Sequence, residues 1–130
     1  MTIYTPLLGS EDFAADAVRA AVGMRKALAE FNASGKAPGR VDFGIGIHSG
    51  KLVAGNIGTL ARLEYTFIGD TVNIASRLES KTKDLGTDII VSGAALAKAK
   101  PSLGLSVAFE SLGKVPLKGK SEALEIYKVI

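Results

Sequence analysis

Cysteine is absent from this chain of 130 residues, and histidine occurs once, as His48. Without cysteine there is no disulfide framework and no thiolate chemistry, a composition compatible with a cytoplasmic protein. A single histidine excludes a metal site built from several histidines. No apolar run approaches ~18 residues, so we expect no membrane span in this chain. No basic region followed by an apolar one stands at the N-terminus, so no signal peptide is evident.

A strong excess of one charge is also missing. The chain has 16 Lys and Arg residues against 13 Asp and Glu residues, for a net charge of +3. This balance is too mild to indicate a nucleic-acid partner, and no Lys/Arg-rich run with interleaved aromatic residues is present. It does suit an anionic small-molecule ligand. The length and the 47% hydrophobic content predict a single domain with a real core.

Hydrophobic periodicity predicts a mixture of helices and strands. We expect a hairpin turn at Ser49-Gly50, a returning strand over residues 51–56 and a loop over residues 57–63. The first residues, up to Leu8, read as the end of a strand running into a turn. The other expected elements are helices over 10–32, 70–84 and 93–100, and strands over 41–47, 65–68, 88–92, 105–112 and 123–130. This order favours an α+β fold with helices packed against one sheet.

The stretch from residue 65 to residue 79 organises the rest of the chain. Its first four residues are β-branched or aromatic, which is typical of a buried strand. Gly69-Asp70 then forms a tight corner, and we expect Asp70 to be the N-cap of the next helix. On a helical wheel the apolar residues of that helix gather on one side; they are Ile74, Ala75, Leu78 and Leu85.

Two polar side chains lie one turn apart on the opposite side of this helix. They are Asn73 and Arg77, which stand beside Ser80. A guanidinium group suits a phosphate, and an amide can bind a sugar or an oxyanion by hydrogen bonding. Taken alone, such a pair is more often an ordinary solvated helix face.

Other polar residues have simpler interpretations. No carboxylate lies near His48 in the sequence, so we interpret it as a structural hydrogen-bonding residue. One carboxylate does not make a magnesium site, so Asp70 is interpreted as a cap and not as a metal ligand. The basic turn near the C-terminus is usually just solvated, but together with Arg77 it could bind a polyphosphate; its lysines are Lys114, Lys118 and Lys120.

Three segments together resemble the class III adenylyl and guanylyl cyclase catalytic domain, of the bacterial type. They are the helix segment 69–79, the glycine-rich segment 44–58 and the loop 117–120. The resemblance implies the conversion of ATP or GTP to the 3′,5′-cyclic nucleotide and pyrophosphate. It also implies a ferredoxin-like βαββαβ fold and a homodimer with active sites at the subunit interface.

The same resemblance assigns roles to four residues. Asn73 and Arg77 match the catalytic pair that orients the ribose and stabilises charge on the transferred phosphoryl group. Lys118 matches the lysine that binds the terminal phosphates. Thr66 matches a purine-selecting position, where a threonine is typical of a bacterial subgroup that makes cyclic AMP, so ATP is favoured over GTP.

The chain departs from the family pattern before its first long helix. Cyclases of this class have two metal-binding aspartates and a purine-selecting lysine there, and bind Mg²⁺ or Mn²⁺. Only a short segment precedes Ser10 here, so we expect a C-terminal portion of the domain, incomplete at its N-terminus. A missing central strand would expose sheet edges and favour a homodimer or strand exchange.

Two other functions compete with this assignment. The chain could be a non-catalytic nucleotide-binding, dimerisation or regulatory module derived from a cyclase, since the aspartates are absent. It could also be a structural α+β domain with an accidental pattern, in which case substituting Arg77 would not alter nucleotide affinity.

The missing aspartates lead to a prediction about turnover. Cyclisation needs metal ions to activate the ribose 3′-hydroxyl and to neutralise the phosphates, so we expect negligible cyclase activity from the isolated chain. Cyclic AMP formation from ATP with Mg²⁺ or Mn²⁺ tests this, and robust activity would contradict it.

Overall fold

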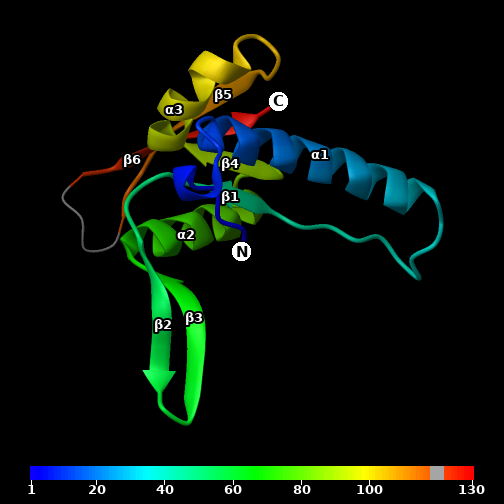
Figure 1. The fold of residues 1–130 in the computed structure, drawn as a ribbon. Helices are drawn as coiled ribbons and strands as arrows, with labels where there is room; N and C mark the ends of the chain where they lie inside the picture. The colour runs from blue at the N-terminus through cyan, green and yellow to red at the C-terminus, as the bar shows by residue number, and fades with distance from the viewer. Residues whose placement is uncertain (118–121) are drawn as a thin grey trace.

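The computed structural model describes residues 1–117 and 122–130 (Figure 1). Within these residues three α-helices accompany a four-stranded mixed sheet and a separate two-stranded hairpin, which confirms the α+β prediction. The elements are η1 (Pro6–Leu8), α1 (Phe13–Ala33), β1 (Ile45–Ile47), β2 (Val53–Thr59), β3 (Arg62–Ile68), α2 (Asp70–Asp84), β4 (Ile89–Ser92), α3 (Gly93–Leu103), β5 (Phe109–Val115) and β6 (Leu124–Val129).

Strand β4 lies inside the sheet, whose strand order is β1-β4-β6-β5. It pairs in parallel with β1 and antiparallel with β6. All four of its residues are buried, because helices cover both faces of the sheet. A short continuous apolar strand of this kind is typical of a sheet that is covered on both sides.

The two faces of the sheet carry two separate cores. Ile89 and Val91 of β4 face α1 and α3, whereas Ile90 between them faces α2, as the alternation of side chains along a strand requires. In Figure 1 α2 accordingly lies on the opposite side of the sheet from α1 and α3. The α2 core contains five buried residues: Ile74, Leu78, Ile90, Leu117 and Ile126.

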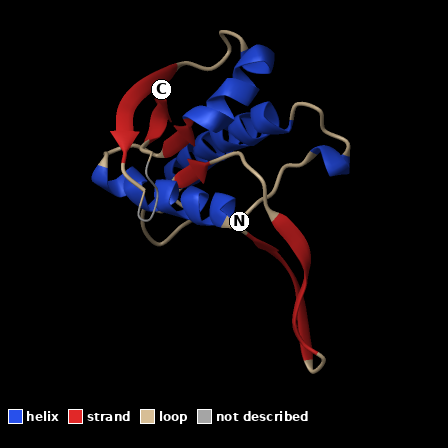
Figure 2. Cartoon of the chain, turned by 90° about the vertical axis from the view of Figure 1, so that its left-hand side faces the viewer, coloured by secondary structure: helices blue, strands red, loops and turns tan. Residues whose placement is uncertain are grey.

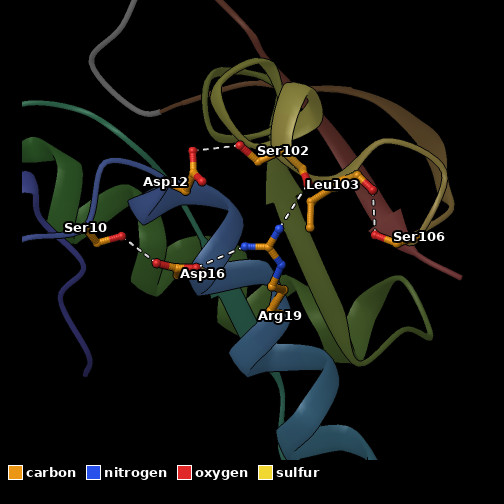
Figure 3. Close-up of polar contacts among 7 residues, drawn as sticks. All are labelled: Ser10, Asp12, Asp16, Arg19, Ser102, Leu103 and Ser106. Atoms are coloured by element: carbon orange, nitrogen blue, oxygen red, sulfur yellow. Dashed lines mark hydrogen bonds and ion pairs between the residues drawn. The ribbon is translucent and has the colours of Figure 1, made fainter.

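Polar contacts join the start of α1 to the end of α3 (Figure 3). The Arg19 guanidinium donates to the Ser102 carbonyl oxygen at 3.0 Å and pairs with Asp16 at 3.1 Å. The Ser102 hydroxyl donates to the Asp12 carboxylate at 2.7 Å. These contacts fix the two helices over one face of the sheet and leave α2 alone on the other.

Helix α2 packs directly against the backbone of β1. A Cβ atom built onto Gly46 would lie 2.3 Å from the Ala75 carbonyl oxygen and 2.4 Å from the Glu79 nitrogen. Both distances are far below van der Waals contact, so only glycine permits this approach. The glycine at this position therefore sets how closely the helix lies on the sheet.

The predicted hairpin at Ser49-Gly50 is wrong. Strand β1 pairs with β4, while β2 pairs with β3 from Val53↔Ile68 to Thr59↔Arg62. The expected loop over residues 57–63 is thus the tip of a hairpin whose two-residue loop is Leu60-Ala61. The favoured two-residue hairpin turns place a glycine or asparagine with positive φ inside the loop. Leu60 and Ala61 have no positive φ, and the nearest glycine of this kind is Gly58, with φ +141°, which lies in β2 before the loop. The turn therefore lacks the sequence pattern by which such hairpins are recognised.

Several predicted boundaries also differ. Helix α1 begins at Phe13 and not at residue 10, and α2 begins at Asp70 itself with Gly69 in the N-cap position. Residues before η1 form no strand, β5 begins at Phe109, and α3 continues past Pro101 to Leu103. Local propensity does not set these ends, because packing decides where the last turns of an element are kept.

The close approach at Gly46 generates a prediction about stability. Gly46→Ala should lower the free energy of unfolding by ~1–3 kcal/mol, because α2 must move away from β1 to admit the methyl group. Gly55→Ala is the matched control: it also lies in a strand, but its Cβ meets nothing within 4 Å. Its effect should stay within ~0.5 kcal/mol. Equal losses in urea denaturation of the two variants would contradict this explanation.

Candidate functional site

The polar side of α2 faces solvent, as the helical wheel predicts. Asn73, Arg77 and Ser80 are exposed, whereas Ile74 and Leu78 on the other side are buried. Leu85 was expected on the buried side, but it is 41% exposed. It is the C-cap residue of α2, where the chain has already left the helix, so the helical wheel no longer describes its direction.

Arg77 differs from the other arginines in its electrostatic surroundings. The chain has five arginines, and each of the other four forms an ion pair with an aspartate or glutamate. No ion pair or side-chain hydrogen bond of Arg77 is found within residues 1–117 and 122–130. An exposed guanidinium without a carboxylate partner keeps its donor fork available to an anionic ligand.

Arg77 also lines a groove of about 290 Å³ between α2 and the end of β5. The β5 side of the groove is the segment 115–117, whose last residue, Leu117, is buried in the α2 core. The burial of Leu117 places the first residue of the loop 117–120 beside Arg77, although the two residues are 40 positions apart in the sequence. Lys118 and Lys120 themselves lie outside the described residues.

Thr66 lies on the hairpin, close to where α2 begins. It is half-buried in β3 and pairs with Gly55 of β2. The prediction of a buried strand around Thr66 is wrong. Tyr65 is 66% exposed and Ile68 is 48% exposed. Thr66 and Asn73 therefore come from consecutive elements, one before and one after the corner at Gly69.

A hydrogen-bonded connection supports the N-terminal end of α2. The Thr71 hydroxyl donates to the Lys51 carbonyl oxygen at 2.6 Å. Farther back in the same loop, His48 Nδ1 lies 2.8 Å from the Ser92 hydroxyl oxygen, which also accepts from the Ala95 amide at the start of α3. The interpretation of His48 as a structural hydrogen-bonding residue is thus confirmed.

A larger cavity of about 580 Å³ lies along β1, between α1 and α2. Its walls are mainly alanine, glycine and other apolar residues, with Glu79 as the acidic residue among its lining side chains. Neither lysine nor arginine is among the described residues that line this cavity, so the α2–β5 groove is the better candidate for binding a polyphosphate.

The described residues do not fit a magnesium or manganese site. Within residues 1–117 and 122–130, no three His, Cys, Asp or Glu side chains come together. Asp70 stands at the first turn of α2, where its charge suits the positive end of the helix dipole. No chemical step through a metal ion can therefore be built from these residues.

Comparison with known proteins assigns the family. Residues 3–130 match the model of the adenylate and guanylate cyclase catalytic domain. Because the match covers nearly the whole chain, the chain belongs to this family, whose members use divalent metal ions.

Curated relatives and solved structures agree with this assignment. The chain is 44% identical over 116 residues to adenylate cyclase 1 of Rhizobium meliloti and 39% identical over 121 residues to an adenylate cyclase of Anabaena cylindrica. These matches cover 88% and 87% of the chain but only 17% and 24% of the relatives. The crystal structure of the adenylyl cyclase CyaB from P. aeruginosa superimposes with a TM-score of 0.72 at 30% identity, covering 91% of this chain and 59% of that one. A guanylyl cyclase structure is similar, with a TM-score of 0.73 at 33% identity.

No helix in the described part of the chain is long and apolar enough to cross a membrane.

The sequence reasoning did not single out Lys81, which lines the same groove as Arg77. Its spacing of four residues from Arg77 was the available signal, because residues four apart share one face of a helix.

Proposed function

We propose that this chain acts in an adenylate cyclase, where it supplies the nucleotide-binding face of the active site and ATP is the substrate. The observation that carries the proposal is Arg77, an exposed arginine that lines a groove with the segment 115–117 and has no ion pair to any described residue. The relatives at 44% and 39% identity are named adenylate cyclases, which supports ATP over GTP.

Each predicted residue has a role in this proposal. Arg77 stabilises the negative charge that develops on the transferred phosphoryl group, and Asn73, one turn earlier, orients the ribose. Preorganised charge of this kind is the main contribution a protein makes to phosphoryl transfer. Lys118 binds the terminal phosphates, and the Thr66 hydroxyl contacts the purine.

No acidic cluster is found within residues 1–117 and 122–130, so these residues do not by themselves make a site for the divalent metal ions that the family uses. In a complete site such ions would supply charge neutralisation at the phosphates and activation of the attacking hydroxyl. The same observation supports the second candidate function, a nucleotide-binding or regulatory module without chemistry of its own. Nucleotide binding without turnover would identify that module.

Arg77 generates the first functional prediction. Arg77→Ala should weaken ATP binding to the chain by about tenfold or more, because a charge-assisted hydrogen bond contributes ~1.5–3 kcal/mol. Isothermal titration with ATP and with GTP measures this and compares the two purines.

Arg40→Ala is the matched control. Arg40 is also exposed, but it is paired with Asp42 at 3.1 Å in the loop before β1. Its removal should leave ATP affinity within about twofold. Equal ATP affinities of the wild-type chain, Arg77→Ala and Arg40→Ala would overturn the proposed function. Tighter binding of GTP than of ATP by the wild-type chain would overturn the substrate assignment.

We further propose that the chain assembles as a homodimer through the β2–β3 hairpin. Figures 1 and 2 show this hairpin extending away from the rest of the molecule. Leu63 and Tyr65 on one of its faces are 57% and 66% exposed, and Tyr65 packs edge-on against Phe67 with ring centroids 5.7 Å apart. An isolated hairpin with exposed apolar side chains is rarely stable without a partner surface.

The hairpin generates a prediction about assembly. Leu63→Ser with Tyr65→Ser should raise the dimer dissociation constant by more than tenfold, since each apolar side chain contributes ~1.5–3 kcal/mol when buried. Leu105→Ser is the control, because Leu105 is fully exposed outside the hairpin. Sedimentation equilibrium at micromolar concentration measures both, and a monomeric wild-type chain would contradict the assembly.

A further inference from the structure

The groove beside Arg77 contains a second cationic side chain. Lys81 lies one turn after Arg77 on α2 and lines the same cavity of about 290 Å³. Lys81 is half-buried, and it has no ion pair or side-chain hydrogen bond within the described residues. Two neighbouring cations that both lack a carboxylate partner repel each other, so a bound anion would stabilise the pair.

The remaining lining residues of the groove suit the terminal phosphate of a polyphosphate better than an inner phosphate. Ser76 and Ser80 contribute hydroxyl groups, although the Ser80 hydroxyl already donates to the Ser76 carbonyl oxygen at 3.2 Å. Asp84 is the acidic residue of the lining and comes nearly one turn after Lys81. A polyphosphate that extends from Arg77 would therefore reach Lys81, and the negative charge of Asp84 would repel it from the groove beyond that lysine.

The spacing along α2 gives the groove a direction. Asn73, Arg77 and Lys81 follow one another at four-residue intervals, which is ~6 Å of rise for each step. Thr66 lies before the first of them, on the strand that leads into the helix. A nucleotide laid along the helix would thus have its base toward β3 and its outermost phosphates toward Lys81.

We propose that Lys81 is a further phosphate-binding residue, which contacts the β- or γ-phosphate of a nucleoside triphosphate whose inner phosphate is bound by Arg77. This inference rests on the proposed function. It adds a binding residue to the site and predicts that affinity depends on the length of the phosphate chain.

A basic residue at this position also has a purely structural interpretation. Lys81 and Lys83 both lie in the last turn of α2, where a positive charge interacts favourably with the helix dipole. Lys83 shares that position but does not line the groove. Lys83→Gln therefore removes the same charge from the same turn and is the matched control for Lys81→Gln.

The experiment titrates ATP and AMP into the full chain and its variants by calorimetry. Lys81→Gln should weaken ATP binding by about tenfold, as expected for the loss of one charge-assisted hydrogen bond, and should leave AMP binding unchanged. Lys81→Arg should restore most of the ATP affinity, and Lys83→Gln should match the wild-type chain for both nucleotides. Thermal unfolding of each variant verifies that the fold is kept.

The possible failures are distinguishable. If Lys81→Gln and Lys83→Gln bind ATP equally while Arg77→Ala binds it weakly, Lys81 is not a phosphate-binding residue and the proposed function stands. An equal loss of ATP and AMP affinity in Lys81→Gln would also overturn the inference, because it would place Lys81 near the nucleoside. Failure of the wild-type chain to bind ATP would overturn both.

Discussion

The packing of α2 directly on the backbone of β1 is the contact on which the rest of the structure depends. A side chain at position 46 would hold the two elements apart, and glycine there lets the helix backbone approach the strand. Once α2 lies this close, Ile74 and Leu78 must point into the sheet. The periodicity of the helix then leaves Asn73 and Arg77 pointing outward. The buried side of the helix therefore determines the direction of its polar side.

A second contact brings the C-terminal part of the chain to the same helix. Leu117 enters the core that Ile74 and Leu78 form with β4 and β6, and this brings the end of β5 against α2. The segment 115–117 is the second wall of the groove that contains Arg77 and Lys81. Apolar packing beneath the groove thus holds its two walls, α2 and the segment 115–117, against each other.

The hairpin β2–β3 shows the opposite arrangement. In the described part of the chain no helix covers either of its faces, and most of its large apolar side chains are exposed. Its sequence nevertheless resembles that of a buried strand, because β-branched and aromatic residues suit both a covered sheet and a surface that a partner covers. Within the described residues it contacts the body mainly through the start of α2, so a change in its position would move Thr66 relative to Asn73.

Periodicity alone determined the α+β class, the long helices and the outward direction of Asn73 and Arg77, because residues on one helix face are related by the geometry of the helix itself. The roles of Asn73, Arg77, Thr66 and Lys118 came from family resemblance and remain predictions. The tertiary structure decided that β1 pairs with β4 and that Arg77 and Lys81 share a groove with the segment before Lys118. Those relations join residues about 40 positions apart. They depend on which apolar surfaces pack together in the folded chain, and no local sequence pattern encodes that choice.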